Sequence, residues 1–267
     1  MTTHEPALPI SPLSDSPEQP AGWSIALESL RLGYGSTVVI ESLTAHIPAG
    51  RITCILGGSG CGKSTLLKHI LGLARPMAGR ILLDGKDATQ MSRREFRQLR
   101  RRMGVLFQDG ALLGSLTLAQ NVALPLVEHS RLPKARIAEI VHEKLTLVGL
   151  EDFKDYHPGQ LSGGMRKRAG LARALATDPP VVLCDEHTSG LDPINAASMD
   201  ALLKAMHRRF NATVVAVSHD LESVRTLADH VILLHEGRAL YQGDVPGLQA
   251  CEDPYVQTFL ARRPINL

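Results

Sequence analysis

The chain has 267 residues, a formal net charge of +2 at pH 7 and 44% hydrophobic residues. That length suits one large α/β domain or two small ones, and the small net charge does not favour nucleic acid as a partner. No run reaches the ~20 apolar residues that span a bilayer, and the N-terminus lacks the apolar core of a signal peptide, so we expect any membrane association to come through a partner.

The first 22 residues differ in composition from the rest of the chain. Residues 1–22 are rich in Pro and Ser without hydrophobic periodicity, which predicts a disordered leader. From Trp23 on, short apolar runs typical of fully buried strands alternate with helical patterns. The strand-like runs are Arg51–Leu56, Val181–Cys184 and Thr213–Val217, and the helical patterns are Ser64–Leu73, Pro193–Phe210 and Asp220–Ala228. This alternation predicts an α/β fold with a mostly parallel sheet.

Two further features refine this fold. Ile81–Gly85 and Leu233–Arg238 contain hairpin-type turns, so we also expect antiparallel strands. Residues of about 110–176 lack strand signals and contain helical patterns, notably Pro133–Val148, which indicates a helical subdomain inserted in the core. We therefore expect one domain over 23–243, followed by a C-terminal tail at 244–267.

A glycine-rich segment between a buried strand and a helix carries the first chemistry. It reads Gly57-Gly58-Ser59-Gly60-Cys61-Gly62-Lys63-Ser64-Thr65. It matches the P-loop pattern, in which backbone N–H groups surround the phosphates of a nucleoside triphosphate. Lys63 adds a positive charge there, and the Ser64 hydroxyl is a ligand for Mg²⁺. A plain glycine-rich turn is the alternative, but the strand–helix context favours nucleotide binding.

Acidic and imidazole side chains follow two other buried strands. Asp185 and Glu186 end the run Val181–Cys184, where Asp185 can hold the Mg²⁺ shell and Glu186 can orient or deprotonate water. His219 follows the run Thr213–Val217, placed to hydrogen-bond the γ-phosphate. Taken alone, the acidic pair is also typical of a turn, and the histidine is more typical of a strand end or a helix cap. Beside a P-loop, the two features together predict hydrolysis.

The pentapeptide Leu161–Met165 contains a second anion-binding pattern. Ser162 is a natural helix N-cap, and Gly163 and Gly164 let backbone N–H groups approach an anion. A simple Ser-capped helix is the alternative for this pentapeptide alone.

With these motifs in this order, residues of roughly 23–243 resemble the nucleotide-binding subunits of ABC transporters. Tyr34 matches the aromatic residue that stacks on adenine, and Gln108 matches the glutamine of the Q-loop. Gly57–Ser64 and Asp185-Glu186 match the Walker A and B motifs. The remaining matches are the signature Leu161–Met165, the D-loop Ser189–Asp192 and the switch residue His219.

The resemblance implies a head-to-tail homodimer with two ATP molecules between the subunits. Each ATP would lie between the P-loop of one subunit and Ser162-Gly163-Gly164 of the other. Gln108 would bind Mg²⁺ or the attacking water and link the site to the helical subdomain, which touches a membrane partner. ATP would favour the closed dimer, and hydrolysis would open it.

Other segments narrow the resemblance to the ATPase subunits of Mla-type, MCE-associated lipid transporters. They are Arg101–Leu113, Asn121–His129, Leu161–Arg168 and Glu252–Leu260. This implies an integral-membrane permease, an MCE-domain lipid carrier and in many cases a STAS-domain protein as partners. The chain would act at the cytoplasmic face of the bacterial inner membrane, where it would power transport of phospholipid or a related lipid. The four cysteines, which show no metal-binding spacing, suit a reducing compartment.

Two residues depart from the family pattern, and two basic segments allow more than one interpretation. His187 stands where the family usually has proline, and we expect ATPase activity to be retained. Met165 replaces the common glutamine but fits the lipid-transport subgroup. Arg93–Arg102 is expected to bury Phe96 and turn its arginines to solvent or to anionic lipid, and Arg166–Arg168 to project into solvent.

Other functions are compatible with the same motifs. The chain resembles, less closely, ABC ATPases for amino acids or other small solutes. A division-type regulatory membrane ATPase is a further alternative. Many soluble ABC factors of DNA or the ribosome carry two nucleotide domains or long inserted arms, and this sequence shows neither.

Overall fold

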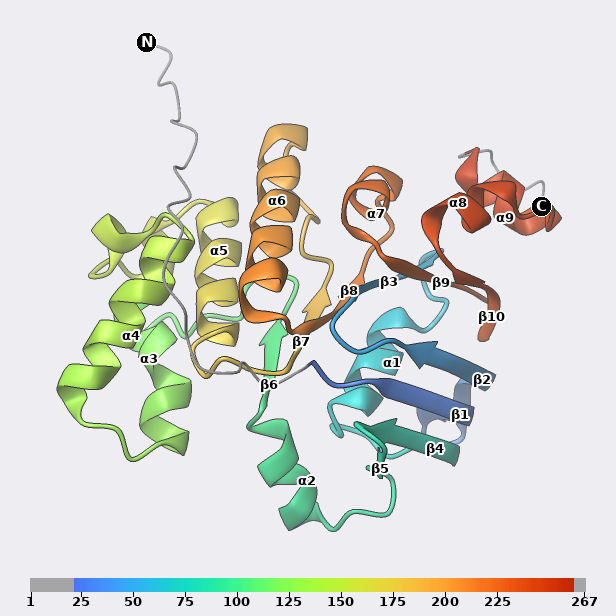
Figure 1. Cartoon of the computed structure of the whole chain (residues 1–267), viewed down its shortest axis with the longest axis horizontal. Helices are drawn as coiled ribbons and strands as arrows, with labels where there is room; N and C mark the ends of the chain where they lie inside the picture. The colour runs from blue at the N-terminus through green and yellow to red at the C-terminus, as the bar shows by residue number, and fades with distance from the viewer. Residues whose placement is uncertain (1–21, 262–267) are drawn as a thin grey trace.

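The computed structural model describes residues 22–261, in which two β-sheets and a group of helices pack together (Figure 1). The strands are β1 (Ile25–Tyr34), β2 (Thr37–Ile47), β3 (Ile52–Gly57), β4 (Ala78–Leu83), β5 (Lys86–Asp87), β6 (Met103–Leu106), β7 (Val181–Asp185), β8 (Thr213–Val217), β9 (His230–His235) and β10 (Arg238–Gly243). The helices are α1 (Lys63–Ile70), α2 (Arg93–Arg100), α3 (Leu118–His129), α4 (Lys134–Leu147), α5 (Gly163–Ala174), α6 (Pro193–Phe210), α7 (Leu221–Leu227), α8 (Val245–Ala250) and α9 (Pro254–Leu260), with short 3₁₀ turns at Glu151–Phe153 and Pro158–Gln160. The predicted leader lies outside the described residues apart from Gly22.

The larger sheet has six strands in the order β10-β9-β3-β8-β7-β6. β3 pairs in parallel with β8 and β9, and β7 pairs in parallel with β6 and β8. Its central strands are apolar on both sides because both faces are covered: Ile55 belongs to one core cluster, whereas Cys54 and Leu56 belong to another. The carboxyl ends of β3, β7 and β8 therefore meet at one edge, where Asp185 pairs with Val217.

The smaller sheet is antiparallel, in the order β2-β1-β4-β5, and shares its core with α1 and one face of the large sheet. Both predicted hairpin turns are present, β4 to β5 through Asp84-Gly85 and β9 to β10 through Glu236-Gly237. The φ values of these four residues are 51°, 74°, 45° and 71°, as a two-residue type I′ turn requires. The predicted α/β fold with parallel and antiparallel sheets is confirmed.

The helices α3, α4 and α5 gather at one side of the large sheet (Figure 1) and enclose a separate apolar cluster. Thr117 caps α3 and Ser162 caps α5 by accepting backbone N–H bonds, from Gln120 and Met165 respectively. Met165 packs against this cluster, so an apolar side chain suits its position. The helical part predicted between the strands is thus present.

The C-terminal segment is more ordered than a tail. Asp244 and Asp253 cap α8 and α9, and a proline lies in the first turn of each helix. Leu248 and Val256 are buried in the core cluster that also contains Cys54 and Leu56 of β3. The segment up to residue 261 therefore packs on the domain core. Across the described residues, no helix has the length and apolar character needed to span a membrane.

Candidate nucleotide-binding and hydrolysis site

The P-loop leads from the end of β3 into α1. Gly62 is the N-cap of α1 with φ 103°, and a Cβ there would lie 2.8 Å from Ile40. Glycine is therefore required at this position by conformation and by space. The Lys63 ammonium donates to the carbonyl oxygens of Gly57 at 2.8 Å and Gly58 at 2.9 Å. Ser59 and Gly60 lie exposed at the tip of the loop, where their backbone is open to an anion.

The next residue joins the P-loop to the predicted acidic pair. The Ser64 hydroxyl donates to Oδ1 of Asp185 at 3.1 Å. Burial and the nearby Glu186 raise the pKa of Asp185, while the bond from Ser64 and the charge of Lys68 oppose the rise. A hydroxyl beside a carboxylate, facing a phosphate loop, is a donor set that Mg²⁺ prefers. The side chains present therefore fit this cation.

Glu186 and His219, each predicted at the end of a buried strand, lie in contact. His219 Nδ1 lies 2.7 Å from Oε2 of Glu186, whose side chain is 15% exposed. Glu186 has φ 52°, a left-handed conformation that costs a non-glycine residue about 1–3 kcal/mol. Its N–H donates to the Val217 carbonyl at 3.0 Å, which ties this conformation to the end of β8. Backbone strain that the surrounding structure maintains is typical of functional sites.

His187, the departure from the family pattern, is fully buried in a polar cluster. Its Nε2 lies 2.8 Å from Oδ1 of Asp200 on α6, and the Ser223 hydroxyl on α7 donates to the same oxygen at 2.7 Å. Asp200 and Ser223 are buried as well. The imidazole therefore links the end of β7 to α6 and α7.

Several of the other predicted residues are exposed. Ser162 and Gly163 are exposed at the start of α5, and Gln108 is exposed after β6. Tyr34 is 46% exposed, with its ring centroid 6.0 Å from that of His69 on α1. Within the described part of the chain, none of the hydrogen bonds joins Gln108 or Ser162 to the P-loop.

The prediction that Arg166–Arg168 projects into solvent is wrong for the middle residue. Lys167 is 4% exposed, and its ammonium donates to the carbonyl oxygens of Glu186 at 2.9 Å and Ser189 at 2.6 Å. Arg166 and Arg168 also bond backbone carbonyls, of Leu161 and Val148. Helical spacing alone did not reveal these acceptors, because they come from segments distant in sequence.

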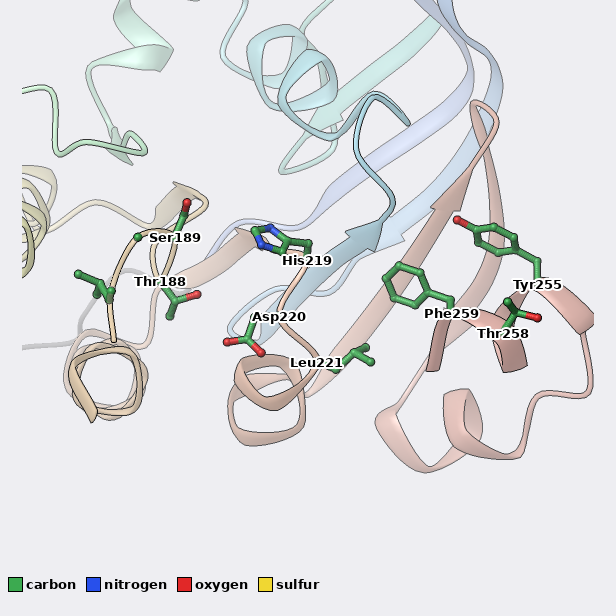
Figure 2. A pocket seen from close by; sticks show the side chains of 10 residues that line it. Thr188, Ser189, His219, Asp220, Leu221, Tyr255, Thr258 and Phe259 are labelled. Atoms are coloured by element: carbon green, nitrogen blue, oxygen red, sulfur yellow. The ribbon is translucent and has the colours of Figure 1, made fainter. Parts of the chain in front are cut away.

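A pocket of about 600 Å³ opens beside His219 (Figure 2). Thr188, the D-loop residues Ser189–Leu191 and the segment from His219 to Leu221 line one side. Tyr255, Thr258 and Phe259 of α9 line the other. The Tyr255 ring stacks on His235, and a Cβ at Gly58 would lie 3.4 Å from its hydroxyl oxygen. Sequence reasoning did not place α9 here; only the likeness of 252–260 to the lipid-transport subgroup pointed to this segment.

A family profile described as "ABC transporter" matches residues 40–189, more than half of the chain. The chain belongs to this family. It is the ATPase of an ABC transporter, and its fold agrees with solved cassettes. A dimeric structure of the bacterial cassette MJ0796 superposes with a TM-score of 0.77 at 31% identity, covering 83% of this chain and 98% of that one. A second MJ0796 dimer, in a post-hydrolysis state bound to ADP and Pi, gives a TM-score of 0.75 at 30% identity, with the same shares covered.

Curated relatives of this ABC ATPase fall into several transport classes. A probable ribonucleotide transport ATP-binding protein, mkl of Mycobacterium tuberculosis, is 43% identical over 92% of this chain and 69% of its own length. The intermembrane phospholipid transport protein MlaF of Haemophilus influenzae is 40% identical over 88% of this chain and 89% of its own. The methionine import protein MetN of Pasteurella multocida is 43% identical over 77% of this chain and 60% of its own length. Identity alone therefore does not select the substrate, although it supports an MlaF-like subunit.

Proposed function

We propose that this ABC ATPase powers the transport of phospholipid or a related lipid, using ATP and Mg²⁺ at the edge formed by β3, β7 and β8. The observation that carries the ATPase mechanism is the pair of contacts at that edge, Ser64 to Asp185 and Glu186 to His219. They put phosphate-binding, cation-binding and water-activating groups side by side.

Each group has a defined task in this proposal. Gly57–Ser64 bind the β- and γ-phosphates through backbone N–H groups, with Lys63 as the neutralising charge. Ser64, Asp185 and Gln108 would hold Mg²⁺, which supplies charge neutralisation on the phosphate oxygens when bound. Thr65 lies beside these groups in the first turn of α1, and Tyr34 stacks on the adenine.

Glu186 orients the attacking water and accepts its proton, in the role of a general base. His219 fixes the Glu186 carboxylate through the 2.7 Å contact and reaches the γ-phosphate from the end of β8. Substituting Glu186 by Gln keeps the shape of the side chain but removes the base. We expect the variant to bind ATP while turning over much more slowly.

The active unit is a head-to-tail homodimer in which Ser162, Gly163 and Gly164 of one subunit bind the ATP held by the partner. The exposure of Ser162 and Gly163 supports this arrangement, as do the dimeric relatives. A mixing experiment tests it with two inactive variants, Lys63→Ala and Gly163→Asp. The second variant fits because a Cβ at Gly163 meets only a side-chain atom at 3.9 Å, and its negative charge repels phosphate.

Mixing the two variants should raise ATP hydrolysis well above that of either variant alone. The reason is geometric: a mixed dimer holds one composite site with an intact Lys63 and an intact Gly163, and one site with both defects. If each chain instead completes its own site, no mixture recovers activity. That result would overturn the head-to-tail dimer.

The lipid substrate is supported by the likeness to MlaF and by the subgroup segments around Arg101–Leu113 and Asn121–His129. We further propose, from this resemblance, an integral-membrane permease, an MCE-domain protein and a STAS-domain protein as partners at the cytoplasmic face of the inner membrane. The likeness to MetN favours one competing substrate class, a small solute such as an amino acid.

A transfer assay distinguishes lipid transport from small-solute transport. The complex is isolated from its source membrane and reconstituted between donor and acceptor vesicles. We expect ATP-dependent transfer of a fluorescent phospholipid by the wild type and its loss with Glu186→Gln. Transfer of methionine from a co-purified soluble solute-binding protein, with no lipid transfer, would overturn the lipid proposal.

A further inference from the structure

The buried ammonium of Lys167 links two segments that have separate tasks. Lys167 lies on α5, five positions after Ser162, and donates to the carbonyl oxygens of Glu186 at 2.9 Å and Ser189 at 2.6 Å. The Glu186 carbonyl also accepts the Ser189 N–H at 3.1 Å, which closes a turn between the two residues. One side chain therefore holds both ends of the turn that joins the catalytic glutamate to the D-loop.

The cost of this arrangement indicates that it does more than fill space. Burial lowers the pKa of Lys167, while the charges of Asp109 and Glu186 act in the opposite direction. A desolvated ammonium is expensive unless its donors are used, and here the acceptors are main-chain oxygens. Glu186 has the strained φ of 52°, and such a conformation persists only where the surroundings fix it. The Lys167 bonds fix it from the side of α5.

The same helix also holds the segment that follows Gln108. Arg173 donates to the carbonyl oxygens of Gly110 at 2.8 Å and Ala111 at 2.7 Å. A Cβ on Gly170 would lie 2.8 Å from the Cα of Gly110, so helix and loop are in close backbone contact. Near its C-terminal end, α5 thus bonds the segment after Gln108 through Arg173. Nearer its N-terminal end, it bonds the turn from Glu186 to Ser189 through Lys167.

We propose that Lys167 is a positioning residue through which the signature helix sets the catalytic turn, so that the two ATP sites of the dimer are coupled. This rests on the proposed head-to-tail dimer, in which Ser162 faces the partner's ATP whereas Glu186 faces the chain's own. ATP docking against the start of α5 then biases the backbone of Glu186 at the other site. The link is short, since one helical turn and one side chain separate Ser162 from the Glu186 carbonyl.

The test compares Lys167→Met, which keeps most of the side-chain volume without the donors, with Lys167→Arg, which keeps donors and charge. Arg168→Met is the matched control, because Arg168 lies on the same helix but bonds Val148 at 3.3 Å. All are measured as the assembled transporter complex, with turnover normalised to the stoichiometry of bound ATP. This normalisation removes the contribution of misfolded protein.

We expect Lys167→Met to lower kcat by about 10- to 100-fold while the KM for ATP changes little, because displacement of a catalytic group by about 1 Å has that effect. The Hill coefficient for ATP should fall towards 1 from a wild-type value approaching 2, the number of sites. Lys167→Arg should recover part of both, and Arg168→Met should resemble the wild type.

A residue that only stabilises the fold would give a different pattern. Lys167→Met would then lower the melting temperature and the bound stoichiometry but leave normalised kcat and the Hill coefficient unchanged, and this would overturn the inference. If Lys167→Met yields no folded complex, Lys167→Leu, which is smaller and also lacks the N–H donors, replaces it, and wild-type values in that variant would overturn the inference equally. Failure of the Lys63→Ala and Gly163→Asp mixture would instead refute the dimer, so the two failures are distinguishable.

Discussion

The buried polar cluster around His187 gives a prediction whose size can be worked from its contacts. In His187→Met, Oδ1 of Asp200 loses the imidazole donor at 2.8 Å and keeps only the Ser223 hydroxyl at 2.7 Å. A hydrogen bond to a charged group contributes about 1.5–3 kcal/mol to stability. Because methionine is similar in size and apolar, the cavity effect is small, and we expect a loss of that magnitude.

Thermal unfolding of the nucleotide-free protein measures this loss. For a domain of this size, about 1 kcal/mol lowers the melting temperature by about 2–4 °C, so His187→Met should melt about 3–12 °C below the wild type. His187→Gln is the control, because its amide N–H can reach Asp200 from nearly the same distance along the side chain. We expect it to retain most of the stability.

Equal melting temperatures for His187→Met and His187→Gln would refute this reasoning, because the two variants differ mainly in the donor. A large loss in both would show instead that the imidazole ring is needed for packing. Ser223→Ala provides a second check, since it removes the other donor to the same oxygen. It should also destabilise the protein, by about 1 kcal/mol or more.

Four further outcomes follow from the hydrolysis site. Lys63→Ala should abolish productive nucleotide binding, measured with a fluorescent ATP analogue. Glu186→Gln should bind ATP and remain in the closed dimer, with steady-state turnover lowered about 10²–10⁴-fold as for the loss of a general base; near-normal turnover would remove Glu186 from that role. The wild-type complex should hydrolyse ATP with His187 in place, and an inactive complex that His187→Pro restores would contradict this. Because burial raises the pKa of Asp185, its charge opposes folding above the ordinary aspartate pKa and not below it. Asp185→Asn should therefore raise the melting temperature of the nucleotide-free protein near pH 7, with the gain vanishing in strong acid; an equal gain at both pH values would contradict this.

Local signals in the sequence predicted those elements whose ends are set by neighbouring residues. The helix predicted over Pro193–Phe210 has those bounds, because Asp192 caps its start and Asn211 ends it in the left-handed conformation. The P-loop and the strand-end carboxylates were equally readable, since each motif follows directly from a buried strand. β6 was not predicted, because four residues that include a glycine carry little periodic signal.

Contacts between distant segments could not be read in the same way. His187 reads as a strand-end departure, and its partner Asp200 lies 13 residues further along the chain. Lys167 reads as a solvent-facing helix residue, but its acceptors are 19 and 22 residues away. The helical period shows which residues share a face, whereas the packing of other elements decides whether that face meets water or carbonyl oxygens.

The two buried groups, Lys167 and His187, both hold the chain at the strained residue Glu186. Its N–H is held by β8 through Val217, its carbonyl by α5 through Lys167, and the residue after it by α6 and α7 through His187. A left-handed non-glycine residue would otherwise relax, and the carboxylate would leave the position where it meets His219. Contacts from β8, α5, α6 and α7 thus fix the position of Glu186, and from the proposed role of Lys167 we expect a shift in α5 to move the Glu186 backbone.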